Sequence, residues 1–195
     1  MSDVDQKAIN AAADKIVQPL HTAGYSVDWL WKDILEPLDD FLSNKGKQLL
    51  EYVPDFQRGH VWTEDQQRKF VEGVLRGVVG RDLLNIRFNC AAWNDDPSGD
   101  LDDRVQCIDG LQRLTAIRNY VAGEIKPFGL SVEQLAPTHY GIKRASFSIK
   151  LSVYDFQNRA DLLKFYLAIN DGGTVHSAAE LTRVRGLLAE VQPSG

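Results

Sequence analysis

Residues 106–114 read Gln-Cys-Ile-Asp-Gly-Leu-Gln-Arg-Leu, an apolar strand that runs into Asp109-Gly110 and then into a helix. The first N–H groups of a helix have no partner within it, and the helix dipole favours negative charge there. Arg113 adds a planar guanidinium that can contact two phosphate oxygens at once. The stretch therefore predicts an anion site, with phosphate as the first candidate. The alternative is an ordinary turn, in which Gly110 permits the bend, Asp109 caps the helix and Arg113 is solvated.

A second Gln-Arg pair lies upstream, in residues 52–62, which read Tyr-Val-Pro-Asp-Phe-Gln-Arg-Gly-His-Val-Trp. Gln57 and Arg58 follow a short apolar run and precede a helix that Thr63 opens with a capping-box pattern. Two such pairs at strand ends can converge on one polyanionic ligand. We therefore expect Arg58 and Arg113 to share one phosphate-sized site.

The pattern of apolar residues predicts helices and strands mixed within a single α+β domain. Helical spacing covers residues 4–20, 63–76, 111–123, 161–169 and 178–188, and residues 27–42 are expected to form a helix interrupted at Pro37. Strand character is found in residues 48–54, 83–90 and 147–154. Residues 94–104 gather aspartates around Pro97 and Gly99, which predicts a mobile acidic loop.

Length and charge limit the class of protein. The 195 residues predict a helical segment over residues 1–44 that packs on a core domain over residues 45–190. The net charge of −5 disfavours extensive nucleic-acid binding. Cys90 and Cys107 lack paired spacing, so they are expected to be buried, reduced thiols. The chain shows neither a leader pattern nor an apolar run of membrane-spanning length, so a cytoplasmic location without membrane contact is expected.

Three motifs, in this order, carry a resemblance to a known family. The first is Pro-x-Phe-Gln-Arg-x-x-x-Trp in residues 54–62, and the second is Asp-Gly-x-Gln-Arg in residues 109–113. The third is Asn-Asp-Gly-Gly-Thr in residues 170–174, followed by Ser177 and Glu180-Leu181. Together they resemble the ParB/sulfiredoxin-fold domain that forms the N-terminal half of GmrSD-type modification-dependent restriction enzymes and of related phage-defence NTPases. The resemblance implies a small mixed sheet surrounded by helices.

The resemblance also implies binding of a nucleoside triphosphate (NTP) and its Mg²⁺-dependent hydrolysis in a phage or bacterial defence or DNA-modification context. Phosphoryl transfer needs neutralised phosphate charge, an oriented water and usually a divalent metal. We assign phosphate binding to Arg58, Arg113 and Gly110, catalysis to Asp109, Gln112 and Gln57, metal binding to Asp109, and a wall of the pocket to Asn170, Gly172 and Gly173. The alternative for both glutamines is structural, with their amides satisfying backbone groups of turns.

The chain departs from the family pattern at Leu111, where the usual motif has glutamine. If that glutamine acts in the transition state, this chain binds NTP but turns it over slowly, and Leu111→Gln raises the rate. Three functions stay open: an NTP hydrolase, a non-catalytic protein-interaction module that retains the pocket, and a small ParB-like DNA-nicking nuclease. A protein partner or a separate nuclease subunit is also expected, because 195 residues leave no room for a nuclease domain beside this one.

Overall fold

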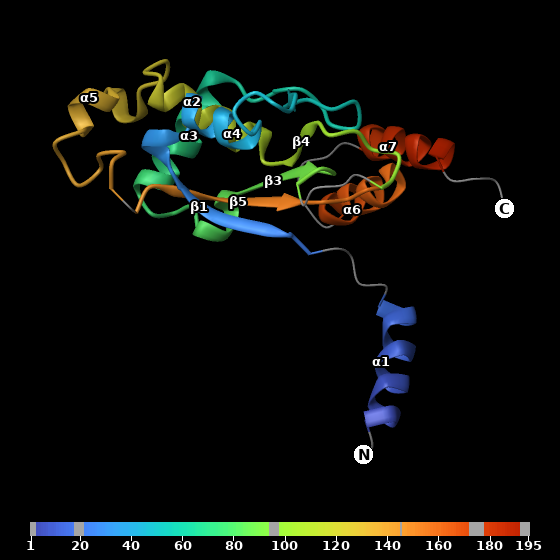
Figure 1. Cartoon of the computed structure of the whole chain (residues 1–195). Helices are drawn as coiled ribbons and strands as arrows, with labels where there is room; N and C mark the ends of the chain where they lie inside the picture. The colour runs from blue at the N-terminus through green and yellow to red at the C-terminus, as the bar shows by residue number, and fades with distance from the viewer. Residues whose placement is uncertain (1–2, 18–21, 94–97, 145, 172–177, 192–195) are drawn as a thin grey trace.

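A computed structural model describes residues 3–17, 22–93, 98–144, 146–171 and 178–191 (Figure 1). In chain order the elements are α1 (Asp3–Val17), β1 (Tyr25–Leu30), η1 (Trp31–Asp33), α2 (Glu36–Leu42), β2 (Leu50–Glu51), α3 (Glu64–Leu75), η2 (Arg81–Leu84), β3 (Asn85–Cys90), β4 (Val105–Asp109), α4 (Leu111–Val121), η3 (Pro127–Gly129), α5 (Val132–Leu135), β5 (Ser148–Tyr154), α6 (Arg159–Asp171) and α7 (Ala178–Val191).

Within these residues, five strands form one mixed sheet in the order β1-β5-β3-β4-β2. The pairs β1–β5 and β3–β4 are antiparallel, whereas β3–β5 and β2–β4 are parallel. Arg87 lies opposite Asp109 at one end of the β3–β4 pair, and Cys90 lies opposite Val105 at the other. The predicted α+β class, with a small mixed sheet surrounded by helices, is confirmed.

The sheet separates two groups of buried apolar side chains. Val105 and Cys107 of β4 belong to the larger group, together with side chains from α2, α3, α4 and α5. Ile108 belongs to the smaller group, together with side chains from α6 and α7. Because successive side chains of a strand point to opposite faces, the two sets of helices cover opposite faces of β4 (Figure 1).

Cys90 and Cys107 are buried free thiols, as predicted, and burial raises the pKa of Cys107 to about 12.

Strand β1 corrects the helix predicted over residues 27–42. Val27 and Trp29 are half-buried whereas Asp28 between them is exposed, which is the alternation of a strand. The strand pairs along its length with β5, where Val27 lies opposite Leu151. This partner is more than a hundred residues away, so local periodicity in a short apolar run could not reveal it. The helical prediction holds for α2, which has Pro37 in its first turn.

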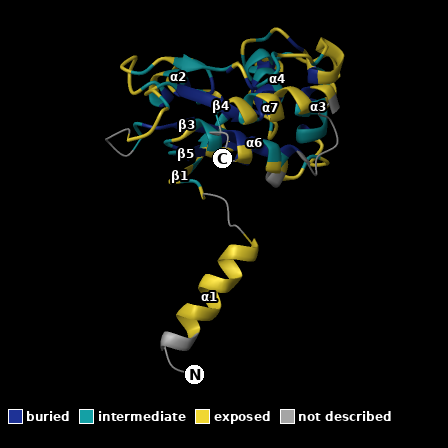
Figure 2. Ribbon diagram, turned by 90° about the vertical axis from the view of Figure 1, so that its right-hand side faces the viewer, coloured by how far each residue is buried: buried dark blue, intermediate teal, exposed yellow. Residues whose placement is uncertain are grey.

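Helix α1 forms as predicted, but it does not pack on the core as predicted. Residues 6–17 are all exposed, and these include the apolar side chains of Ile9, Ile16 and Val17 (Figure 2). Alanine has the highest helix propensity but offers little area to bury, so an alanine-rich segment can be helical without being part of a core. None of the described helices is both long and apolar enough to cross a membrane.

The acidic loop makes specific hydrogen bonds where the structure describes it, and its mobility stays a prediction. The N–H groups of Ser98 and Leu101 donate to Gln157, at 2.9 and 3.1 Å. The carboxylate of Asp100 accepts from the backbone N–H of Arg159 at 2.7 Å, so it caps the start of α6 from another part of the chain. Gly99 lies so close to this segment that a Cβ there would be 2.0 Å from the Gln157 carbonyl oxygen. Residues 94–97 lie outside the described residues.

Candidate anion-binding site

The turn between β4 and α4 requires glycine for two reasons. Gly110 is the N-cap of α4 and has φ +96°, in the left-handed region. A Cβ at this position would also lie 2.6 Å from Cδ1 of Ile86 on the neighbouring strand. No side chain caps the helix, and the first N–H groups of an α-helix have no partner within the helix. Phosphate binding at Gly110 stays a prediction.

Asp109 joins two arginines instead of capping the helix. Its Oδ2 atom accepts from Arg87 at 2.6 Å and from Arg113 at 2.9 Å. Arg113 also donates to the Leu83 carbonyl at 2.7 Å, so its guanidinium is held in place and is not freely solvated. The Nε of Arg87 is buried and has no hydrogen-bond partner among the described residues. The geometry therefore differs from the ordinary-turn alternative in two respects, because Asp109 does not cap the helix and Arg113 is not freely solvated. It also places two guanidinium groups beside the N-terminus of α4.

The first and third motifs contact each other. A side-chain nitrogen of Arg58 lies 3.7 Å from Oε2 of Glu180 on α7. Arg183, one turn further along α7, donates to the carbonyls of Asp55 and Phe56, the latter at 3.0 Å. These contacts hold the Phe-Gln-Arg segment against α7.

Tyr166 on α6 connects this region to β4. Burial raises the pKa of its phenol above the ordinary value; the charges of Glu180 and Asp109 add to the rise, and those of Arg183 and Arg58 oppose it. The charges of Arg58, from the first motif, and of Asp109, from the second, thus both act on this buried phenol. The shared phosphate site expected for Arg58 and Arg113 stays a prediction.

Each of the two motif glutamines, Gln57 and Gln112, hydrogen-bonds backbone groups close to the other motif. Oε1 of Gln112 accepts from the N–H groups of Val61 and Trp62, at 2.9 and 3.1 Å, and its Nε2 donates to the Gly59 carbonyl at 3.1 Å. The second motif thereby holds the loop of the first. This is the structural alternative for Gln112, because its amide oxygen accepts two hydrogen bonds from backbone groups and its amide nitrogen donates one.

Gln57 makes the complementary connection. In the amide orientation that suits its neighbours, its nitrogen donates to the carbonyls of Cys107 and Tyr52, at 3.0 and 3.1 Å. Cys107 lies in β4, directly before the second motif, so the first motif holds the strand of the second. We call these reciprocal contacts of Gln57 and Gln112 the glutamine clasp. The geometry favours a positioning role over the predicted catalytic one for both residues.

The charges around the site are unequal. The guanidinium groups of Arg87 and Arg113 face the single carboxylate of Asp109, an excess of one positive charge beside the start of α4. This local excess stands against a chain with a net charge of −5. A polyanion would neutralise it and would also use the uncapped helix N-terminus.

The carboxylates do not form a preformed metal cage. No group of three or more His, Cys, Asp or Glu side chains is placed to hold a metal ion in the described part of the chain. Asp109 uses Oδ2 for both arginines. Mg²⁺ in nucleotide sites is commonly held by one or two carboxylates together with substrate phosphates. The residues present therefore fit a Mg²⁺ ion that arrives with a triphosphate, and not one bound by the protein alone.

The predicted pocket wall is described only in part. Asn170 is buried in α6, where its amide donates to the Tyr166 carbonyl at 2.7 Å, so it supports the helix that carries Tyr166. Gly172 and Gly173 lie outside the described residues.

Leu111 is a core residue. Its side chain is 6% exposed and belongs to the larger apolar group. A polar side chain there would have to leave the core to reach a ligand.

Two arginines of the site were missed by the sequence reasoning. Arg87 interrupts the apolar strand 83–90, where a charged residue between Ile86 and Phe88 was a usable signal. Arg183 follows Glu180 by three residues, one helical turn, so the third motif could have been extended to include it. Both contacts depend on partners distant in sequence.

The family model of the GmrSD restriction endonuclease N-terminal domain matches residues 38–185, most of the chain. This chain belongs to that family. The GmrSD N-terminal domain runs here from α2 into α7, so it contains all four arginines of the site and leaves out α1 and β1. Membership places the chain in a restriction or defence context. Comparisons with curated proteins and with solved structures give no match.

Proposed function

We propose that this GmrSD-type domain binds an NTP, with the phosphates at the N-terminus of α4, and hydrolyses it with Mg²⁺ in phage or bacterial DNA-modification defence. The observation that carries the proposal is the excess of guanidinium groups beside an uncapped helix N-terminus. A ParB/sulfiredoxin-like fold, a cytoplasmic location and a separate nuclease subunit as partner belong to the same proposal.

The arginines would exchange carboxylate partners for phosphate oxygens. Arg113 and Arg87 share Asp109, and Arg58 faces Glu180, so each guanidinium is already held near the place where phosphate would bind. Charge-assisted hydrogen bonds to phosphate, formed with little rearrangement, favour binding. Asp109 would then be displaced from the arginines and could turn toward Mg²⁺ or a water.

Mg²⁺ would be held by the triphosphate and by Asp109, and when bound it supplies neutralisation of the charge that develops on the phosphates. Within the protein, Arg58 and Arg113 would orient the phosphates, and the N–H groups of α4 would hold one phosphate oxygen. The glutamine clasp would keep the two motifs at a fixed separation during this step.

Isothermal titration of the full chain with ATP, GTP and CTP, with and without Mg²⁺, tests the proposal. We expect binding by the parent, and a loss of roughly tenfold or more in affinity for Arg113→Ala and Arg58→Ala, because each removes a charge-assisted contact. Arg144→Ala is the matched control, because Arg144 is exposed and donates to the Thr138 carbonyl away from the motifs. Absence of binding by the parent, or unchanged affinity in both arginine variants, would refute the proposal.

Asp109→Asn separates binding from hydrolysis. Removing its charge frees Arg87 and Arg113 for phosphate, so NTP affinity measured without Mg²⁺ should rise, whereas turnover with Mg²⁺ should fall because the carboxylate that faces Mg²⁺ or water is lost. Phosphate release and titration on the same preparation measure both effects. Unchanged turnover would exclude a catalytic role for Asp109.

The glutamine clasp favours a second candidate, a non-catalytic interaction module that retains the pocket. Gln57 and Gln112 both engage backbone groups, so the amides that were expected to orient water are already occupied. NTP binding without measurable turnover by the parent would support this candidate over the hydrolase.

A further inference from the structure

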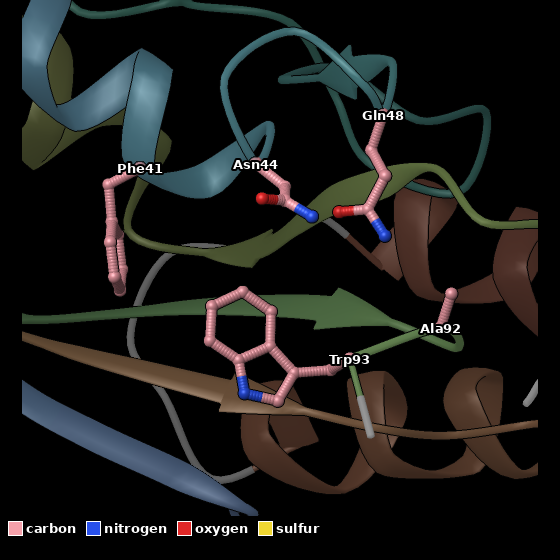
Figure 3. A pocket seen from close by; sticks show the side chains of 5 residues that line it. All are labelled: Phe41, Asn44, Gln48, Ala92 and Trp93. Atoms are coloured by element: carbon pink, nitrogen blue, oxygen red, sulfur yellow. The ribbon is translucent and has the colours of Figure 1, made fainter. Parts of the chain in front are cut away.

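A pocket of about 250 Å³ opens at the other end of the β3–β4 pair from the anion site. Phe41, Asn44, Gln48, Ala92 and Trp93 line it (Figure 3). Phe41 comes from α2, Asn44 and Gln48 from the loop that follows it, and Ala92 and Trp93 from the turn after β3. The family motifs contribute none of these residues. The volume is below the roughly 300 Å³ at which sites for drug-sized ligands begin, so it suits one small ring system.

Aromatic side chains form one part of this pocket. The ring centroid of Trp93 lies 5.8 Å from that of Phe41 and 5.5 Å from that of Tyr25. Phe41 is in turn 4.9 Å from Trp29, so the indole of Trp93 is supported by a row of rings at the sheet edge. Trp93 stays partly exposed. A supported and partly exposed indole is a suitable platform for stacking a planar ligand.

Two amide side chains form the other part. Figure 3 shows the amide groups of Asn44 and Gln48 directed into the same space above Trp93. Each amide has both donors and an acceptor, which is the combination that pairs with the edge of a nucleobase. The side chain of Gln48 also hydrogen-bonds the thiol of Cys90. A purely apolar ligand would leave the amide of Asn44 unsatisfied.

The loop that carries the amides has an unusual and well-supported backbone. Asn44, Lys45 and Gly46 have φ values of 48°, 57° and 79°, three consecutive left-handed residues. The loop is closed by the N–H of Gly46, which donates to Oγ of Ser43 at 3.0 Å, and by the N–H of Gln48, which donates to the Ser43 carbonyl at 3.0 Å. The loop is thus shaped before a ligand arrives.

The charged side chains near the pocket favour some planar or aromatic-binding ligands over others. Lys45 and Lys47 are exposed on the same loop, and among the described residues no carboxylate lines the pocket. Aromatic cages that hold quaternary ammonium groups depend on attraction of a cation, which the two lysines oppose. The same lysines favour a neutral ring that carries a phosphate.

From these observations we infer that this pocket binds a single unpaired nucleobase, stacked on Trp93 and hydrogen-bonded at its edge by Asn44 and Gln48, with its phosphate near Lys45 and Lys47. The base can belong to a free nucleotide or to a single strand. One base is a small contact, so the inference is compatible with the acidic net charge of the chain.

The test uses the full chain, nucleoside monophosphates and a fluorescently labelled eight-nucleotide single strand. Anisotropy and quenching of tryptophan fluorescence measure binding. We expect Trp93→Leu to weaken binding at least about fivefold, because loss of an aromatic platform has effects of this size or more. Trp93→Phe should retain part of the affinity. Tighter binding of the strand than of every monophosphate identifies a strand as the ligand, and equal binding identifies the free nucleotide.

Matched variants make the test independent of folding and of the anion site. Gln48→Met removes one amide while keeping the side chain nearly the same size. Asn44→Gly removes the other amide, and glycine accepts the positive φ at this position. Both variants should weaken binding, whereas the control Gln6→Met on α1 should not. Lys45→Ala with Lys47→Ala should reduce binding, whereas Lys143→Ala should not. Arg113→Ala alters the candidate anion site and not this pocket, so it should leave binding of the single strand unchanged. Failure of the NTP proposal would therefore not affect this result. No binding by the parent, unchanged affinity in both amide variants, or preference for tetramethylammonium would overturn the inference.

Discussion

Leu111 occupies the motif position at which this chain departs from its family pattern, and its environment changes the expected effect of restoring glutamine. The side chain packs in the larger apolar group, beneath the first turn of α4. A glutamine amide at this position would lose apolar contacts and would have to find partners in the core or leave it.

We therefore expect Leu111→Gln to lower the free energy of unfolding by about 1–3 kcal/mol, the usual cost of a buried polar group without a partner. Turnover should not rise, contrary to the expectation from the motif alone. Urea unfolding and phosphate release measure the two effects. Leu111→Met is the control and should cost less than about 1.5 kcal/mol. A stable and faster Leu111→Gln variant would show that position 111 can reach the ligand.

The charged motif residues have partners that are simpler to interpret than those of the polar ones. Arg113 pairs with Asp109 at the start of α4 and Arg58 faces Glu180, while their roles in phosphate and metal binding stay predictions. Gln57 and Gln112 were harder to interpret, because an amide can serve a water or a backbone group equally well. Only the position of the partner segment, about fifty residues away in each case, decides between these roles.

At the scale of elements, the glutamine clasp joins the loop before α3 to the β4–α4 turn. Gln112→Met should leave the N–H groups of Val61 and Trp62 and the Gly59 carbonyl without their partner. We expect a loss of about 1–2 kcal/mol of unfolding free energy, because these groups are partly accessible to water. Gln6→Met, on the exposed face of α1, should change stability by less than about 0.5 kcal/mol.

The double variant Gln57→Met, Gln112→Met tests whether the two contacts form one unit. If each holds the same pair of segments, the two losses will not add, and a coupling of about 0.5 kcal/mol or more should appear in a double-mutant cycle of urea unfolding. Additive losses would show two independent braces.

Elements with local signals were predicted well, and elements defined by distant partners were not. Thr63 and Gln66 form the predicted capping box at the start of α3, with both reciprocal hydrogen bonds present. The whole signal lies within four residues. Strand β1 instead depends on β5, and the anchoring of Asp100 depends on the start of α6. No window of sequence contains both members of either pair.

At the scale of the whole molecule, α1 stands apart from the described core (Figure 2). Deletion of residues 1–17 should therefore leave the free energy of unfolding within about 0.5 kcal/mol of the parent value, the range typical of surface changes. Urea unfolding followed by tryptophan fluorescence is a suitable measurement, since all four tryptophans lie outside the deleted segment. A larger loss of stability would show that α1 contacts the domain in solution.

The three segments of the anion site lie far apart in the chain, and this separation governs when the site can exist. Arg58 comes early, Asp109 and Arg113 come in the middle, and Glu180 and Arg183 come near the end. During synthesis Arg58 therefore gains its carboxylate partner Glu180 only after α7 has left the ribosome, and closing such long loops is slow compared with forming a local helix. A partly made chain can hold α3 and α4 before the Phe-Gln-Arg segment is held against α7, so the ion pair of Arg58 with Glu180 would report completion of the whole fold.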